Sequence, residues 1–230
     1  MPQHDLARAL QDLSVLALPV LLAITSHEAA HGIVAYWLGD DTAYRQGRVS
    51  LNPARHIDPF GTIVLPILLY LTGGFLFGFA KPVPTNASRL RSPRRDMVLV
   101  ALAGPGMNIG LAVISAVLIY GAIWLPSMAR PWAIDVLQTS VTINLVLAAF
   151  NLLPLPPLDG SHVIASLLPR PLAIRYASFG RYGILIVLAL FFVLPEITVR
   201  LGVPIDPFAW LIGGPVEWMS GLIWRAVGLD

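Results

Sequence analysis

The pentad His27-Glu-Ala-Ala-His31 constrains this chain most, because it places three ionisable side chains inside an apolar run. Residues 13–38 are otherwise almost entirely apolar, and at about 1.5 Å per helical residue they are long enough to cross the ~30 Å of hydrocarbon in a bilayer. Positions i and i+4 share one face of a helix, so both imidazoles can bind one metal ion. Ionisable groups are costly within a bilayer and mark functional sites there. The segment therefore predicts a membrane-spanning helix that carries a metal site.

Composition indicates an integral membrane protein. Of 230 residues, 56% are hydrophobic and only 12% are charged, whereas a soluble domain has about 25% charged residues. The chain has no cysteine, which excludes disulfides and thiolate ligands, so metal ligands must be His, Asp or Glu. No basic patch is interleaved with stacking aromatic residues, so nucleic-acid binding is unsupported.

Apolar segments recur along the whole chain. After the first one they occupy residues 60–80, 97–125, 133–153, 182–203 and 207–228. Glycines and prolines interrupt 60–80 and 207–228, and 207–228 is either a sixth span or an interfacial hairpin. We expect an all-α polytopic membrane protein with about five to six transmembrane helices. Between the first and second core helices, 60–80 is expected to form a re-entrant or short β-like segment.

The whole chain, 1–230, is expected to form one intramembrane domain. Its core would be 13–165, followed by C-terminal membrane segments over 182–228. No small-residue cleavage site follows the first apolar run, so we expect a retained span rather than a signal peptide.

Three basic loops suggest the orientation in the membrane. Residues 40–58, 81–96 and 157–181 are rich in arginine and should face the cytoplasm. This requires that 60–80 does not cross fully. The first helix then runs inward with the pentad in its cytoplasmic half, and the segment 133–153 brings Asp159 to the same side.

A catalytic zinc ion usually has three protein ligands and one water, so a third ligand is needed. Asp159 is preferred, because the prolines before it end the preceding helix and Gly160 gives the backbone freedom after it. An Asp-Gly pair in such a place is otherwise typical of a surface turn with a helix cap. The other candidates for the third ligand are His162, His56, Glu196 and Glu217.

Two amides lie in apolar helices. Asn151 and Asn108 either hold neighbouring helices together or contact the substrate, and Asn151 is placed to stabilise an oxyanion. Gly106 and Gly110 form a small-residue face that predicts close helix packing near Asn108. His56 is either a loop histidine near the membrane surface or a gate at the site.

Together these residues resemble the site-2 protease family of intramembrane zinc metalloproteases. The resemblance rests on the pentad, on Ala103-Gly-Pro-Gly-Met-Asn108 and on Asn151-Leu-Leu-Pro-Leu-Pro-Pro-Leu-Asp-Gly160. The segments Asn52–Gly61 and Gly78-Phe-Ala-Lys-Pro-Val-Pro84 resemble the compact bacterial and archaeal branch. No stretch is long enough for the PDZ or CBS domains that many members carry.

The resemblance implies a role for each motif residue. His27, His31 and Asp159 would be the ligands of Zn²⁺, Glu28 the catalytic base, and Asn151 a substrate-binding residue. Asn108 and His56 are further substrate-binding candidates.

The expected function is zinc-dependent hydrolysis of peptide bonds in or near transmembrane segments. Substrates would be single-span or signal-peptide-like membrane proteins in the lipid bilayer of a prokaryotic cell, with the active site toward the cytoplasm. The 60–80 region and nearby loops would offer strand-like edges to an extended substrate.

Two alternatives remain at this point. The first is a metal-binding or metal-transporting membrane protein without protease activity, but segments 97–125 and 182–194 offer no second polar path across the bilayer. The second is a catalytically silent scaffold, against which the intact Glu28 argues, since zinc binding alone does not require it.

Overall fold

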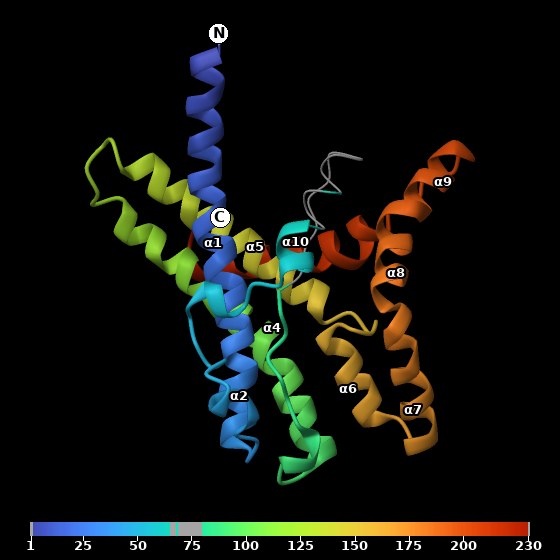
Figure 1. The fold of residues 1–230 in the computed structure, drawn as a ribbon. Helices are drawn as coiled ribbons and strands as arrows, with labels where there is room; N and C mark the ends of the chain where they lie inside the picture. Colours follow the sequence, from blue (N-terminus) through green and yellow to red (C-terminus); the bar gives the residue numbers. More distant parts are fainter. Residues whose placement is uncertain (1, 65–67, 69–79, 230) are drawn as a thin grey trace.

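Three long helices form the centre of the protein. The computed structural model describes residues 2–64, 68 and 80–229, and the regular secondary structure in this part of the chain is helical throughout, without strands. The central helices are α1 (Pro2–Trp37), α4 (Pro93–Ala122) and α5 (Arg130–Asn151) (Figure 1). Each of the three packs against the other two.

Small residues fill the interfaces between these helices. Lipid tails are as apolar as leucine, so membrane helices associate by close packing, which small side chains permit. Many of the large side chains point outward, and leucines such as Leu21, Leu22 and Leu118 are exposed to the surroundings. This apolar exterior suits contact with lipid. The buried alanines of these three helices are Ala23, Ala29, Ala30, Ala35, Ala101, Ala112, Ala116, Ala122, Ala148 and Ala149.

Among the described residues, four helical stretches are long and apolar enough to cross a membrane. They are Leu10–Trp37, Pro93–Ala122, Arg130–Asn151 and Arg170–Arg200. The expected all-α polytopic membrane architecture is therefore confirmed. The expected number of spans was about five to six, with 60–80 as a re-entrant segment, and 207–228 is not among these four stretches.

The first of these two segments is described only in part. A π-helical turn, η2, covers Pro59–Val64. Residues 65–67 and 69–79 lie outside the described residues, so the re-entrant or β-like character of 60–80 stays a prediction.

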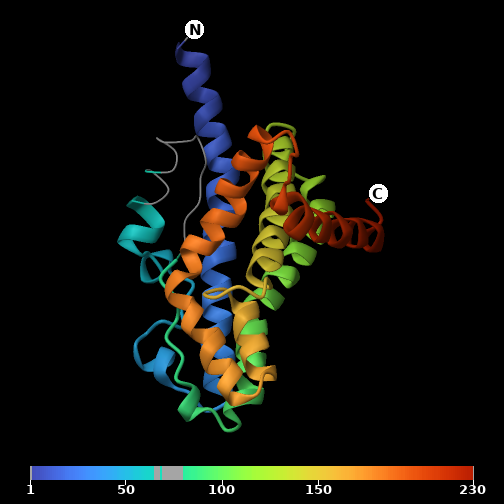
Figure 2. The same ribbon diagram turned by 90° about the vertical axis from the view of Figure 1, so that its right-hand side faces the viewer.

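The second segment lies across the bundle. It forms η6 (Ala209–Gly213) and α10 (Gly214–Val227), and Figure 2 shows α10 roughly perpendicular to α1. Its buried Ile223 packs against residues of α4 and α5, including Ala116 and Leu145. This direction does not agree with a sixth span beside the core helices.

The fourth membrane-length stretch is made of short helices in succession. They are α7 (Arg170–Ser178), η4 (Phe179–Tyr182), α8 (Gly183–Leu188), η5 (Ala189–Val193) and α9 (Leu194–Arg200). Val187 and Phe191 pack against Ala149, Leu153 and Ile212. The link from α5 is α6 (Asp159–Leu167), which packs against α4.

The three basic loops lie at one end of the bundle, the lower end in Figure 1. The chain turns after α1 at Gly39, whose φ of 110° suits glycine. The backbone N–H of Arg91 then donates to the carbonyl of Leu38 at 3.1 Å, and Arg94 donates to the carbonyl of Leu168. Residues 40–58, 81–96 and the α6–α7 junction are thereby brought together. The short helices here are α2 (Thr42–Arg45), η1 (Pro53–Arg55) and η3 (Ala87–Arg89).

Ion pairs tie the first two of these loops to each other. Asp41 accepts hydrogen bonds from Arg45 and from Arg89 of the other loop. Desolvation acts to raise the pKa of Asp41, but the hydrogen bonds and charges of the two arginines outweigh it and hold that pKa below its ordinary value.

Candidate active site

Three side chains from two distant parts of the sequence meet at one point. His27 and His31 lie one turn apart on α1, and Asp159 is the first residue of α6. The two Nε2 atoms are 3.1 Å apart. Asp159 Oδ2 lies 3.1 Å from Nε2 of His27 and 3.3 Å from Nε2 of His31. Among the described residues, these three form the group of His, Asp and Glu side chains close enough to hold a metal ion.

The hydrogen bonds of the two imidazoles fix their tautomers. His31 Nδ1 lies 2.7 Å from the carbonyl oxygen of Val100. A carbonyl only accepts, so Nδ1 carries the proton and Nε2 presents a lone pair. His27 Nδ1 lies 2.7 Å from the side-chain oxygen of Asn108, which leads to the same tautomer. The orientation of that amide follows from its nitrogen, which donates to Asn144 Oδ1 at 2.8 Å and to a carbonyl of α1.

The resulting donor set fits zinc. Both Nε2 atoms present lone pairs, and Oδ2 of Asp159 is buried without a hydrogen-bond donor in the described part of the chain. Three acceptors this close repel one another unless a cation lies between them. A tetrahedral site with ligand distances of about 2.0 Å has edges of about 3.3 Å, close to the separations here. Two imidazoles and one carboxylate leave the fourth position for water.

Glycines let the backbone approach these side chains. A Cβ atom on Gly104 would lie 2.4 Å from Nε2 of His31 and 2.7 Å from Nε2 of His27. The α4 backbone therefore passes directly beside the two Nε2 atoms. The packing role expected for Gly106 and Gly110 is wrong, because a Cβ on either would meet nothing within 4 Å. The close approach between α4 and α1 is at Gly104, whose nearest side chains are His27 and His31 of α1.

The start of α6 is held in a similar way. A Cβ on Gly160 would lie 2.2 Å from the carbonyl oxygen of Leu152. The Asp-Gly pair thus sits against the end of α5, and only a residue without a side chain fits after Asp159. This contact orients the carboxylate toward α1.

Glu28 lies on the loop side of α1, beside His27 in sequence. Its half-buried carboxylate accepts a hydrogen bond from the backbone N–H of Val83, with a distance of 2.8 Å from N to Oε2. Val83 belongs to the stretch 80–86, which has no regular secondary structure. The residue expected to be the base is therefore held by a loop, unlike the two imidazoles, which contact α4.

The structure places the other sequence candidates differently. Asn151 donates to the carbonyl of Leu147 in its own helix at 3.0 Å. His56 is buried and donates from Nε2 to the carbonyl of Ser50 at 2.8 Å, inside the first loop. Glu196 forms an ion pair with Arg200 on α9.

Comparison with known proteins relates the chain to zinc metalloproteases. The family model described as "Peptidase family M50" matches residues 122–194. Two relatives named "Putative zinc metalloprotease" match over more of the chain. YwhC of Bacillus subtilis is 41% identical over 182 residues, which is 76% of this chain and 79% of that protein. Rip2 of Mycolicibacterium smegmatis is 32% identical over 196 residues, 81% of this chain and 71% of that protein.

The chain belongs to peptidase family M50. It is a site-2 protease-like zinc metalloprotease embedded in the membrane. This disfavours the alternatives of a metal-transporting protein and of a silent scaffold. No solved structure matches the fold.

In this M50 protein, sequence reasoning missed a chain of buried polar groups behind His27. Asn108 is fully buried and donates to Asn144, which in turn donates to the carbonyl of Ser140 at 2.8 Å. The hydroxyl of Ser140 lies 2.8 Å from that of Ser115 on α4. A signal was present in the sequence, since residues 140 and 144 are polar at i and i+4 and therefore share one face of the helix.

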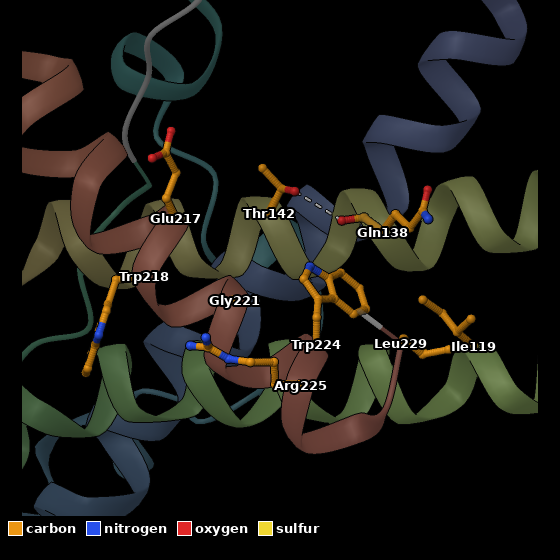
Figure 3. Close-up of a pocket in the computed structure, with 9 residues that line it drawn as sticks. All are labelled: Ile119, Gln138, Thr142, Glu217, Trp218, Gly221, Trp224, Arg225 and Leu229. Atoms are coloured by element: carbon orange, nitrogen blue, oxygen red, sulfur yellow. Dashed lines mark hydrogen bonds between the residues drawn. The ribbon is translucent and has the colours of Figure 1, made fainter.

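A cavity of about 910 Å³ lies apart from the cluster of His27, His31 and Asp159, between α10 and the helices α4 and α5 (Figure 3). Glu217 and Arg225 of α10 line it together with Gln138 and Thr142 of α5. None of the three clustered side chains lines this cavity. Glu217, a sequence candidate for the third ligand, thus belongs to a different place in the fold.

Proposed function

We propose that this protein hydrolyses peptide bonds in or near transmembrane segments of membrane proteins, with single-span or signal-peptide-like proteins as substrates. The observation that carries the proposal is the position of the His27, His31 and Asp159 cluster among helices of membrane-spanning length. A metalloprotease site at that depth meets peptide bonds that soluble proteases do not reach.

The proposed ligands of zinc are His27, His31 and Asp159. Bound there, zinc supplies a Lewis acid for the scissile carbonyl and lowers the pKa of its water ligand toward about 7. Asn108 and the carbonyl of Val100 keep the imidazoles in the ligating tautomer. Such supporting hydrogen bonds also make the imidazole a better ligand.

Glu28 is the proposed general base. It lies one residue from a ligand, and its carboxylate is half-buried at the boundary between α1 and the loops. It accepts the proton of the attacking water and later donates it to the amine of the leaving peptide. Asn151, at the end of α5, is the proposed contact to the extended substrate.

Comparison of wild type with Glu28→Gln tests this function. Both are assayed on a reconstituted single-span substrate, and zinc is quantified in each. The expected result is loss of cleavage with zinc retained, because the base is removed and all three ligands remain. Glu196→Gln is the matched control, since this exposed carboxylate lies on α9. Cleavage by Glu28→Gln at the control rate would refute the base assignment.

We further propose that the site faces the cytoplasm. The three basic loops share one end of the bundle, and the pentad lies in the half of α1 that leads to them. The chain has no cysteine, so single cysteines at Ser50, Ser92 and Ser166 can be probed with thiol reagents in intact cells. In intact cells, a membrane-permeant thiol reagent should block all three cysteines, and an impermeant reagent should block none of them. Reaction of the Ser92 site with an impermeant reagent would contradict this orientation.

A further inference from the structure

The segment Lys81-Pro82-Val83 is extended, yet its backbone groups are paired one after another. The N–H of Lys81 donates to the carbonyl of His56 at 2.8 Å. The carbonyl of Lys81 accepts from Arg48 Nη2, also at 2.8 Å, and that of Pro82 lies 3.4 Å from the same nitrogen. The N–H of Val83 then donates to Glu28. A loop segment with this many partners is held in one position rather than left open as an edge for a substrate strand.

Prolines on both sides of Val83 fix the register of this contact. Pro82 and Pro84 have no backbone N–H, so Val83 supplies the single amide donor of the tripeptide. A slip by one residue in either direction would face Glu28 with a proline. The sequence thus allows one donor at one place.

Side-chain packing holds the same segment against α1. A Cβ on Gly32, one turn after Glu28, would lie 2.9 Å from a methyl of Val49 and 3.4 Å from a methyl of Val83. Both loops therefore rest on α1 where glycine provides space. Val83 is 8% exposed, which shows how closely it is covered.

Arg48 closes the arrangement from the other loop. Its side chain is 8% exposed, and no carboxylate forms an ion pair with it in the part of the chain that the structure describes. Its Nε atom is buried without a partner there. Burying an unpaired cation is costly. The buried guanidinium of Arg48 donates a hydrogen bond to the carbonyl of Lys81. This carbonyl lies two residues before Val83, whose N–H holds Glu28.

We propose that Lys81–Val83, fastened by Arg48, is a positioning element that sets the carboxylate of Glu28 for proton transfer. This inference rests on the proposed role of Glu28 as the base. The single N–H of Val83 restrains one carboxylate oxygen and leaves the other for the reacting water. Without it, zinc binding would persist and turnover would fall.

Val83→Pro removes this N–H while keeping extended backbone, and Val83→Ala keeps the N–H while removing most of the side chain. Relative to Val83→Ala, we expect Val83→Pro to lower kcat by about 10- to 100-fold, the range for one hydrogen bond to a charged group. KM and zinc content should be unchanged. Thr85→Pro is the matched control, because no acceptor for its N–H is found among the described residues.

Equal kcat values for Val83→Pro and Val83→Ala would overturn the positioning role while leaving the proposed function intact. Full cleavage by Glu28→Gln would instead refute the base assignment on which this proposal rests, and absence of cleavage by wild type would refute the proposed function itself. If Val83→Pro loses zinc or does not fold, Arg48 provides the test. Arg48→Met should lower kcat at constant KM and zinc content, and Arg48→Lys should restore part of it through one donor. If kcat falls in both Arg48 variants together with a changed KM and a loss of zinc, Arg48 has a merely structural role and the proposal is contradicted.

Discussion

The two sides of the pentad helix hold their functional groups by different means. Toward the bundle, His27 and His31 are fixed by an amide and a carbonyl of α4, both buried in helix packing. Toward the loops, Glu28 is fixed by one backbone N–H of an extended segment. Ligands of a metal ion must keep one geometry, whereas a base that gives and takes a proton works beside a substrate that enters and leaves. The helix thus separates a rigid binding side from a side built of loops.

Removing the proposed ligand Asp159 should have the largest effect on zinc binding and activity. Asp159→Ala leaves two protein ligands, so zinc and activity should both be lost. Metal content by elemental analysis and a cleavage assay on the same sample measure this. Retention of one equivalent of zinc would mean that Asp159 only caps α6, and His162 would be the next candidate.

Gly104→Ala should come next in effect. Its methyl would enter the space of both Nε2 atoms, so we expect zinc affinity to fall by at least about 10-fold, as for other disturbances of ligand orientation. Gly106→Ala on the same helix adds a methyl into open space and serves as the control. Competition with a chelator measures both affinities. Equal affinities would show that α4 yields more easily than its packing suggests.

Asn108→Leu probes the second layer of the rigid side. The change leaves Nδ1 of His27 without an acceptor, and we expect zinc affinity to fall by about 10- to 100-fold. Asn144→Leu should have a smaller effect, because it touches His27 only through Asn108. A chelator titration of the two variants ranks them. The order would be reversed if the polar chain served helix association alone.

The sequence was most informative where the evidence is local. The spacing of His27 and His31 depends only on helical geometry, and the apolar runs depend only on side-chain chemistry. Asp159 was selected from several candidates because the prolines before it and the loop charges suggested one depth in the membrane. The structure brings it to the two imidazoles.

Only the tertiary structure decided what supports these groups. The sequence left open whether Asn108 contacts a neighbouring helix or the substrate. Its partner is His27, because α4 crosses α1 at this point. Gly104 differs from Gly106 in nothing that the sequence displays, because a close approach depends on the neighbouring helix. The N–H of Val83 is common to all residues except proline, so its role has no side-chain signature. Long-range packing selects which backbone groups meet a functional side chain, and residue type alone does not encode that choice.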